Sequence, residues 1–415
     1  MDNLSLGYAQ ARDAIDRFAD KRAEFLLPHG VIYLDGNSLG PLTHAASKAV
    51  QATLHSEWGT GLIRSWNDAD WINLPETVGA KIAPLIGTSP ENVIMADSTS
   101  VNLFKVLSAA CAIQTGRKTI LTERLNFPTD NYIAEGVIRQ MGYHHRLRYV
   151  EQSETLTACL DDDVAVVLLT HVNYRTGQMH DMAAITKAAH ERGALVIWDL
   201  AHSAGAVPLD LKGDKVDFAV GCGYKYLNGG PGAPAFLYVS DRYLSELFQP
   251  LTGWFAHKSP FAFDAEFTPS YDIRQYLCGT PPVLSAIALN AALDIWQNVD
   301  IHDVRTKSLA LTDYLINLVE ARCAGHGLQL ITPIDHQIRG SQISFTHPEA
   351  GYPIIAALIA EGVIGDFRAP DILRFGVTPL YTSFADLWWA VDRLAAILDE
   401  RRWDQPQFHQ QKEVT

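Results

Sequence analysis

Cysteine is scarce in this sequence, and no two cysteines are spaced as a metal-binding or disulfide-forming pair. The 415 residues include 5 cysteines, which lie far apart and form no Cys-x-x-Cys motif. An odd number of isolated cysteines argues against a disulfide framework and against a zinc module. We therefore expect free thiols, a reducing compartment and no bound metal ion.

Basic runs, long apolar runs and a nucleotide-binding glycine motif are missing as well. The 33 lysines and arginines are outnumbered by 47 aspartates and glutamates, giving a formal net charge of −14, which argues against binding to nucleic acid. No apolar run approaches the length of a membrane span, and Met1–Gly7 lacks the basic and apolar regions of a signal peptide. We expect a cytoplasmic protein without nucleic-acid or membrane partners. Because no Gly-x-Gly-x-x-Gly follows an early strand, a dinucleotide-binding oxidoreductase is a weak alternative.

The residues that are present are typical of a globular protein with a large buried core. Hydrophobic residues make up 47% of the chain, and 415 residues are enough for one large domain with a smaller one, or for two similar domains. An apolar strand pattern at 164–170 is followed by a helical pattern at 182–192 and another strand pattern at 194–198. This alternation predicts an α/β fold with right-handed crossovers and a mainly parallel, buried sheet. Ligands should bind at the carboxyl ends of its strands.

The last third of the chain has a different pattern, which predicts a smaller α+β domain. A long amphipathic stretch from Ser285 to Arg322 precedes short strands that alternate with helices. The strands are expected at 328–331, 341–345, 363–367 and 372–375, and the helices at 354–360 and 384–401. Near the other end, Tyr8–Phe25 has helical spacing. We assign 45–285 to the large domain, and both 1–44 and 286–415 to the small one.

A single lysine, Lys225, stands between a strand pattern and a loop rich in glycine. Val216–Val220 has the pattern of a short strand, and Asn228–Gly232 permits backbone angles that other residues avoid. An amine held near apolar groups has a lowered pKa and can condense with a carbonyl as a Schiff base. Taken alone, however, a surface lysine in a loop is the simpler interpretation.

Polar residues after two other strands suit a ligand with an anionic group and a ring nitrogen. Thr99 and Ser100 fall at the predicted start of a helix, where backbone N–H groups and the helix dipole favour a phosphate. Simple capping of the helix by a hydroxyl is the alternative. Asp199 directly follows a strand, where its carboxylate either holds a proton on a ring nitrogen or caps a helix. His202 is either a ligand contact or a histidine bonded to nearby backbone.

Polar residues near both ends of the chain are candidates for substrate binding. Arg374 alternates with Leu373 and Phe375, so its side chain is expected on the opposite face of a strand. There its guanidinium could bind a carboxylate bidentately, although a solvated sheet face is the simpler interpretation of the spacing. Asn37 and Ser38 lie in a tight loop that either faces a ligand or needs its glycines for geometry alone.

Together these residues describe a site for pyridoxal phosphate. We expect Thr99 and Ser100 to bind the phosphate and Phe127 to stack on the ring. Asp199 would pair with the ring nitrogen, and Lys225 would hold the aldehyde. Arg374 would bind an amino-acid carboxylate. The combination in this order carries the interpretation, since each residue alone has a simpler one.

Six segments are more specific than the general pattern. They are Tyr33-Leu-Asp-Gly-Asn-Ser-Leu-Gly40, Asn126-Phe-Pro-Thr-Asp130, Thr170-His-Val-Asn-Tyr-Arg-Thr-Gly177, Trp198-Asp-Leu-Ala-His-Ser-Ala-Gly-Ala206, Tyr224-Lys-Tyr-Leu-Asn-Gly-Gly-Pro-Gly232 and Leu373-Arg-Phe-Gly-Val-Thr-Pro-Leu-Tyr381. Over essentially its whole length the chain resembles the kynureninase family, in the aminotransferase class V group of fold type I pyridoxal-phosphate enzymes. The resemblance implies that fold and the hydrolysis of L-kynurenine, or its 3-hydroxy form, to anthranilate (or 3-hydroxyanthranilate) and L-alanine in tryptophan breakdown.

The resemblance also implies a role for each matching residue. Lys225 would bind the cofactor covalently, Asp199 would hold its ring nitrogen, and Tyr224 would be the candidate acid or base. The other cofactor contacts would be Thr99, Ser100, Phe127, Asp130, Thr170, His202 and Tyr224, with Trp254 and Thr280 reaching the phosphate from the partner subunit of a homodimer that shares its active site. Substrate contacts would be Arg374 on the α-carboxylate, and Asn37, Ser38 and Trp66 near the aromatic part.

Two other functions fit parts of the same pattern. A cysteine desulfurase uses a similar lysine and aspartate but needs a nucleophilic cysteine on a mobile loop. Cys278 falls where a phosphate contact is expected and Cys323 ends an apolar helix, so we interpret both as structural. A non-catalytic protein that binds pyridoxal phosphate is the second alternative. The presence of Lys225, Asp199 and Arg374 argues against it.

Overall fold

The chain folds into two compact units, one built from both chain ends and one from the middle. The computed structural model describes residues 3–151 and 155–412. Unit 1 contains the chain up to Ala45 and from Asp294, together with Tyr174–Met179, and unit 2 contains the remainder. Across the described residues, no helix combines the length and the apolar character needed to pass through a membrane.

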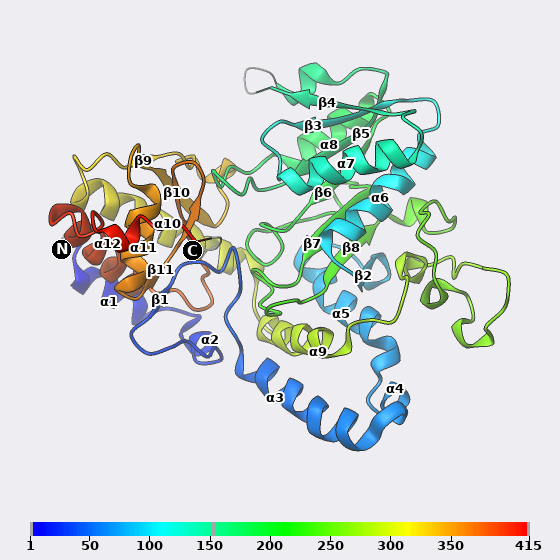
Figure 1. The fold of residues 1–415 in the computed structure, drawn as a ribbon, viewed down its shortest axis with the longest axis horizontal. Coiled ribbons are helices and arrows are strands. Elements are labelled where there is room, and N and C mark those ends of the chain that lie inside the picture. Colours follow the sequence, from blue (N-terminus) through cyan, green and yellow to red (C-terminus); the bar gives the residue numbers. More distant parts are fainter. Residues whose placement is uncertain (1–2, 152–154, 413–415) are drawn as a thin grey trace. The chain divides into compact units, whose positions relative to one another are not determined.

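Unit 2 is built around a seven-stranded sheet (Figure 1). Its order is β2-β8-β7-β6-β5-β3-β4, and neighbouring strands are parallel except at β8, which is antiparallel to both β2 and β7. The strands are β2 Val93–Ala96, β3 Thr119–Glu123, β4 Arg146–Val150, β5 Val164–Thr170, β6 Leu195–Asp199, β7 Phe218–Cys222 and β8 Ala235–Val239. The mainly parallel sheet predicted from the sequence is confirmed.

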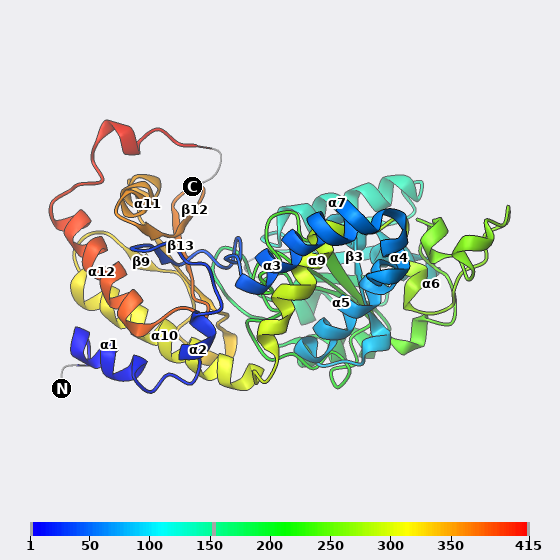
Figure 2. The same cartoon turned by 90° about the horizontal axis from the view of Figure 1, so that it is seen from below.

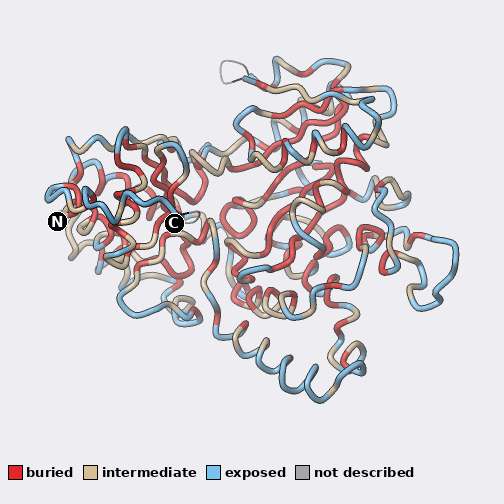
Figure 3. Tube along the Cα trace, in the orientation of Figure 1, coloured by how far each residue is buried: buried red, intermediate tan, exposed pale blue. Residues whose placement is uncertain are grey.

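Helices cover this sheet, which is why its central strands are mainly apolar. Helix α6 packs against α7 and against β5, β7 and β8, while α8 packs on β6 and α5 packs on β2 and α9. The helices are α3 His44–Ala52, α4 Ser65–Asp68, α5 Leu74–Ile82, α6 Thr99–Ile113, α7 Pro128–Gln140, α8 Met182–Glu191 and α9 Val283–Ala292. Every residue of β5, β6 and β7 is buried (Figure 3). A strand covered on both faces needs a continuous apolar sequence, as β5 has up to Thr170.

The carboxyl ends of three parallel strands lie side by side in this sheet. The strand register places Thr170 at the end of β5 opposite Asp199 at the end of β6, and Asp199 opposite Val220 of β7. The loops that follow these strands therefore start from one edge of the sheet, where ligands of open parallel sheets bind.

Unit 1 contains a four-stranded antiparallel sheet with the order β12-β13-β10-β9. One face of the sheet buries Ile343, Phe345, Leu373 and Phe375 in the core of the unit. The helices α1, α12 and α10 lie next to one another (Figure 2), and β1 pairs in parallel with β11. The elements are α1 Leu6–Asp13, α2 Ala19–Arg22, β1 Ile32–Tyr33, α10 Ile301–Arg322, β9 Gln329–Leu330, β10 Gln342–Thr346, α11 Gly351–Ala360, β11 Val363–Ile364, β12 Asp366–Arg368, β13 Ile372–Gly376 and α12 Phe384–Asp399.

The helix expected over Tyr8–Phe25 is wrong, because the chain forms two short helices there. Helix α1 ends at Asp13, whose carboxylate accepts hydrogen bonds from the backbone N–H groups of Phe384 (2.7 Å) and Ala385 (2.9 Å). Asp13 thus caps the start of α12. Ile15 follows on the exposed surface of the unit, so the apolar spacing in this stretch does not follow one buried helical face.

Other differences concern elements with weak sequence patterns. The amphipathic stretch after Ser285 is divided into α9 and α10, and α10 begins after Asp300, whose side chain accepts from the N–H of His302 (2.8 Å). Helix α7 and strands β4 and β8 have no counterpart among the predictions. Pro128 occupies the first position of α7, where the fixed φ of proline favours a helix start.

Candidate active site

Lys225 lies three residues beyond β7, at the carboxyl edge of the sheet in unit 2. The chain turns sharply just after it, since Asn228, Gly230 and Gly232 all have positive φ, as their residue types predict. The backbone N–H of Asn228 donates to the carbonyl of Lys225 (2.9 Å). The lysine side chain is half-buried, and its Nζ lies 2.9 Å from Nε2 of His202. The amine is therefore bonded inside the unit, and a simple surface lysine is excluded.

Two buried carboxyl groups, Asp130 and Asp199, form a hydrogen-bonded pair near this amine. Burial raises the pKa of both, and for Asp130 the neighbouring carboxylate of Asp199 raises it further. For Asp199 the charge of Lys225 and the N–H of Ala201, which donates to Oδ1 (2.8 Å), act in the opposite direction. We therefore place the proton on Asp130, which donates to Asp199. Asp199 remains the ionised acceptor.

Thr170 and Asn126 supply further hydrogen bonds around Asp130. The hydroxyl of Thr170 donates to Oδ2 of Asp130 (3.1 Å), and the backbone N–H of Thr170 donates to Oδ1 of Asn126 (2.9 Å). Asn126 is buried, and sequence reasoning did not place it in the site. Its position at the start of the Asn126-Phe-Pro-Thr-Asp130 segment was the available signal.

Phe127 and Tyr224 present aromatic rings to Lys225. The lysine Nζ is 6.0 Å from the ring centroid of Phe127 and 5.8 Å from that of Tyr224. The Phe127 ring is 36% exposed at the start of α7, so it offers a surface for another ring. Burial raises the pKa of the Tyr224 hydroxyl, and the neighbouring Cys222 and Asp199 raise it further. The phenol therefore keeps its proton at neutral pH. Cys222, at the end of β7, is a neighbour that the sequence patterns did not single out.

Thr99 and Ser100 are the first two residues of α6, but neither of them caps it. Ser98 does so, because its Oγ accepts from the N–H of Val101 (3.4 Å). The first N–H groups of a helix have no partner inside the helix and favour an anion. With capping assigned to Ser98, the hydroxyls of Thr99 and Ser100 are not needed for it.

Trp66, Trp254 and Thr280 belong to the same unit but have other neighbours. Trp66 packs against Trp71 and Phe255, with ring centroids 6.0 and 6.4 Å apart. Trp254 is partly exposed, and Thr280 is exposed. Within the part of the chain that the structure describes, no hydrogen bond or ring contact of these three side chains involves Lys225 or its neighbours.

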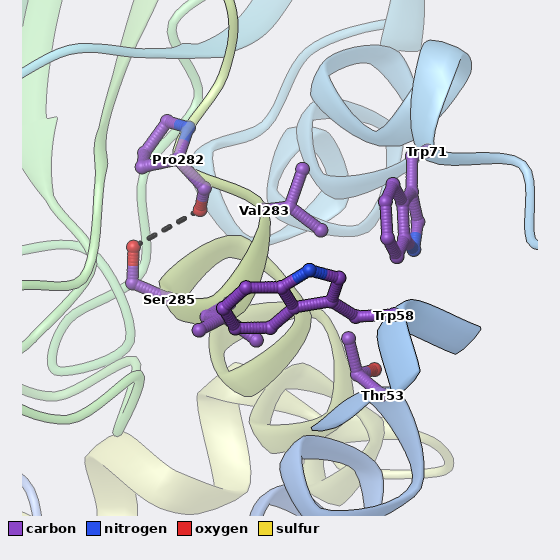
Figure 4. A pocket seen from close by; sticks show the side chains of 7 residues that line it. Thr53, Trp58, Trp71, Pro282, Val283 and Ser285 are labelled. Atoms are coloured by element: carbon purple, nitrogen blue, oxygen red, sulfur yellow. Dashed lines mark hydrogen bonds between the residues drawn. The ribbon is translucent and has the colours of Figure 1, made fainter. Parts of the chain in front are cut away.

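An apolar pocket of about 450 Å³ lies elsewhere in unit 2. It is lined by Thr53, Trp58, Trp71, Pro282, Val283, Leu284 and Ser285. Figure 4 shows Trp58 across the pocket below Val283, with Trp71 to its side and Ser285 donating to the carbonyl of Pro282 (3.1 Å). None of the predicted site residues lines this pocket, whose lining is mainly apolar apart from the hydroxyl groups of Thr53 and Ser285.

Arg374 lies in unit 1, in the middle of a row of polar side chains. The strand register places it opposite Asp366 of β12 and Ser344 of β10. It points away from Leu373 and Phe375, as predicted, because those residues belong to the core. The solvated sheet face is wrong, however, since Arg374 is 1% exposed. Its charge can be buried because Asp366 pairs with it.

The structure brings Asn37 and Ser38 to Arg374. One guanidinium nitrogen, Nη2, donates to Asp366 and to the Ser38 hydroxyl (2.7 Å), and Nη1 donates to the carbonyl of Tyr174 (2.8 Å). When the Asn37 amide is oriented to satisfy its neighbours, its oxygen accepts from Nε of Arg374 (3.1 Å). Sequence reasoning missed Asp366. The available signal was the short turn that separates its strand from that of Arg374, because a hairpin places the two opposite each other.

Comparisons with known proteins match both parts of the chain. A family described as "Kynureninase C-terminal domain" matches residues 304–394, and one described as "Cys/Met metabolism PLP-dependent enzyme" matches residues 77–233. A kynureninase from Pseudomonas fluorescens is 53% identical over 409 residues, 98% of each chain. A kynureninase from Burkholderia mallei (strain SAVP1) is 52% identical over 411 residues, 98% of this chain and 99% of the relative.

Solved structures share the fold at low identity. A cysteine desulfurase from Thermococcus onnurineus NA1 superposes with a TM-score of 0.77 at 17% identity, covering 92% of this chain and 98% of its own. A C-DES mutant with glycine linked covalently to its PLP cofactor gives a TM-score of 0.77 at 18% identity, covering 90% and 98%. These likenesses concern the fold alone. They confirm the predicted fold type I architecture.

Proposed function

This chain belongs to the kynureninase family, and from that premise we propose how its residues hydrolyse L-kynurenine to anthranilate and L-alanine. The chain is a hydrolase that depends on pyridoxal phosphate and cleaves a carbon–carbon bond. The observation that carries this conclusion is the identity of 52% and 53% with two kynureninases over 98% of the chain.

The residues around Lys225 fit pyridoxal phosphate. A buried ionised carboxylate, an amine beside a histidine and an exposed aromatic ring are the groups that its ring nitrogen, aldehyde and ring face require. We assign these contacts to Asp199, Lys225 and Phe127. When bound, the cofactor supplies an electron-accepting ring that stabilises negative charge on the substrate carbons. The remaining contacts would be Thr99 and Ser100 with the phosphate at the start of α6, and Asp130, Thr170 and His202 around the ring.

Lys225 and Tyr224 would move the protons of the reaction. Hydrolysis adds water to the side-chain ketone of kynurenine and breaks the bond between Cβ and Cγ. Nζ of Lys225 would take the proton from Cα, hold it during this cleavage and return it to Cα of the product. The hydroxyl of Tyr224 would donate a proton to Cβ, which becomes the methyl group of L-alanine, and would be restored by a proton of the added water, whose oxygen stays in the carboxylate of anthranilate. The pKa of the Tyr224 hydroxyl, raised by burial, keeps its proton in place at neutral pH.

Four further residues would bind the substrate. The guanidinium of Arg374 would take the α-carboxylate, because its planar N–H groups match that anion. Asn37 and Ser38 contact Arg374, and we propose that they extend the same site toward the aromatic part of kynurenine. Trp66 would lie near that aromatic part.

A homodimer would complete the site. Trp254 and Thr280 are at least partly exposed, which supports the proposal that they face a second subunit and contact the cofactor phosphate there. All five cysteines are free thiols, which supports a reducing, cytoplasmic location.

Two variants of neighbouring residues test this assignment. The purified enzyme should be yellow and should release fluorescent anthranilate from kynurenine, and 3-hydroxykynurenine should be assayed beside it. Lys225→Ala should lose covalent attachment of the cofactor, which is read from the absorbance spectrum after gel filtration. Tyr224→Phe should stay yellow and lose turnover by roughly 100-fold or more, the usual contribution of a positioned acid. Unchanged turnover in Tyr224→Phe would refute the role of that hydroxyl, and a protein inert toward both substrates would refute the function.

A further inference from the structure

A row of buried polar side chains crosses the small sheet of unit 1. Asp366, Arg374 and Ser344 are directly opposite one another on β12, β13 and β10. Residues opposite each other in antiparallel strands point to the same side of the sheet. All three are nearly inaccessible, with exposed fractions of 2%, 1% and 0%. The charges in this row are therefore balanced by protein groups and not by solvent.

Asp366 has three polar neighbours in this region. Its Oδ2 accepts from Arg374 and from the hydroxyl of Ser38 (3.0 Å), and it forms an ion pair with Nη2 of Arg368 (2.9 Å). One carboxylate thus serves two guanidinium groups. A second carboxylate is needed to balance their charges.

Asp35 supplies that second carboxylate, and it is connected to Arg374 through Asn37. In the amide orientation described above, Nδ2 of Asn37 donates to Oδ1 of Asp35 (3.3 Å) while its oxygen accepts from Nε of Arg374 (3.1 Å). The ionisable side chains that face Asp35 are Tyr33 on β1, Asp366 and Arg368 on β12, and Arg374 on β13. Burial and the nearby Asp366 carboxylate raise the pKa of Asp35 to about 7. Its charge is therefore the one in the cluster that a small perturbation can change.

A substrate carboxylate at Arg374 would upset the charge balance. Two arginines and two ionised aspartates are neutral together, so a third carboxylate would leave one negative charge uncompensated beside the buried pair of Arg374 and Asp366. We infer that an amino-acid carboxylate binds at Arg374 together with a proton, and that Asp35 is the residue that takes up this proton. The inference rests on the proposed role of Arg374 and adds Asp35 to the substrate site.

Because the carboxylate binds together with a proton, its dissociation constant should rise with pH. Below about pH 7 Asp35 already carries the proton, and binding needs no further uptake. Above that pH the free protein has lost the proton and must recover it, so the dissociation constant rises by up to about tenfold per pH unit. An Asn at position 35 imitates the protonated carboxyl group. Asp35→Asn should therefore remove the rise of the dissociation constant above pH 7. At high pH this variant should bind the carboxylate at least as tightly as wild type.

Calorimetry of L-alanine binding to the holoenzyme tests the inference. Titrations at pH 8 in two buffers of different ionisation enthalpy give the number of protons taken up per site. Wild type should take up more protons than Asp35→Asn, with a difference approaching one, because proton transfers at the cofactor are common to both proteins. Asp20→Asn, at an exposed position of unit 1, should match wild type. If Asp35→Asn does not fold, Asp35→Ser provides a second neutral variant.

The calorimetric results distinguish the role of Asp35 from the proposed role of Arg374. A smaller proton uptake in both neutral variants, with a flatter dependence of the dissociation constant on pH, supports the inference. Equal uptake in wild type and Asp35→Asn overturns it while the carboxylate site at Arg374 stands. Absence of L-alanine binding in wild type would instead remove the proposed role of Arg374 and the inference with it.

Discussion

The two buried carboxyl groups near Lys225 have the same chemistry but different protonation. Asp130 carries the proton, because burial and the adjacent Asp199 raise its pKa well above the usual value. An Asn at position 130 keeps the donor and the shape, so Asp130→Asn should lower kcat by less than about tenfold, the contribution of one neutral hydrogen bond. Asp199→Asn would remove the charge that we propose holds the ring nitrogen of the cofactor. It should lower kcat on the order of 100- to 1,000-fold.

The same substitution at two touching positions makes this a matched comparison. Turnover of kynurenine is measured for both variants at saturating cofactor, and retention of the cofactor is checked by absorbance. Comparable losses in both would contradict the assignment of the proton to Asp130.

The sequence identified candidate site residues where a polar side chain lies at or just after the end of an apolar strand. Lys225, Asp199 and Thr170 stand at strand ends, where apolar patterns stop abruptly. Asp366 was not readable, because its importance comes from the strand opposite it, and spacing within one strand says nothing about its neighbour. The same reason explains why the spacing around Arg374, taken alone, favoured a solvated sheet face.

At the level of elements, the bounds of helices and strands were predicted well where the apolar residues follow a clear strand or helix pattern. The bounds of β5 (Val164–Thr170) match the apolar run, and α8 (Met182–Glu191) differs by one residue from the helix expected there. Strand β4 was missed because it lies at the edge of the sheet and mixes arginines with apolar residues. The break after α1 was missed because Asp13 caps a helix more than 350 residues later in the chain.

We expect the cap formed by Asp13 at the start of α12 to stabilise the fold. The first turn of α12 has three N–H groups bonded to side chains: Phe384 and Ala385 donate to Asp13, and Asp386 donates to Ser383 (3.0 Å). Asp13→Ala leaves the first two without these acceptors and should lower the free energy of unfolding by about 1–2 kcal/mol. Urea unfolding followed by circular dichroism measures this change. Asp20→Ala, which removes an exposed carboxylate from the same region, should leave the midpoint nearly unchanged, and equal shifts in the two variants would argue against the cap.

At the scale of the whole molecule, the chain order does not give the order in space. Strand β2 comes first in unit 2 but lies at one edge of the sheet, beside β8, which comes last. Unit 1 is assembled from both ends of the chain. These arrangements bring together residues such as Asp35 and Arg374, and the sequence contains no local pattern for such pairings.

Self-association is the remaining property of the whole molecule that the proposed function requires. Trp58, which lines the apolar pocket, is 55% exposed, and Ile63, five residues later in the chain, is 76% exposed, and we expect this surface to be covered by the second subunit. Ile63→Asp would bury an unpaired charge there, which costs roughly 3–5 kcal/mol and should weaken the dimer more than about 100-fold. Sedimentation velocity measures the dimer, with Tyr143→Asp, at a 72% exposed position, as the control.

The same variant connects assembly to catalysis. If Trp254 and Thr280 complete the phosphate site of the other subunit, dissociation removes two cofactor contacts from each site. The specific activity of Ile63→Asp should then fall on dilution and recover when protein or pyridoxal phosphate is added, since both shift the equilibrium toward the loaded dimer. Monomers with full activity at every concentration would show that each chain holds a complete site. A dimer that persists in Ile63→Asp would place the interface on another surface of unit 2 or on unit 1.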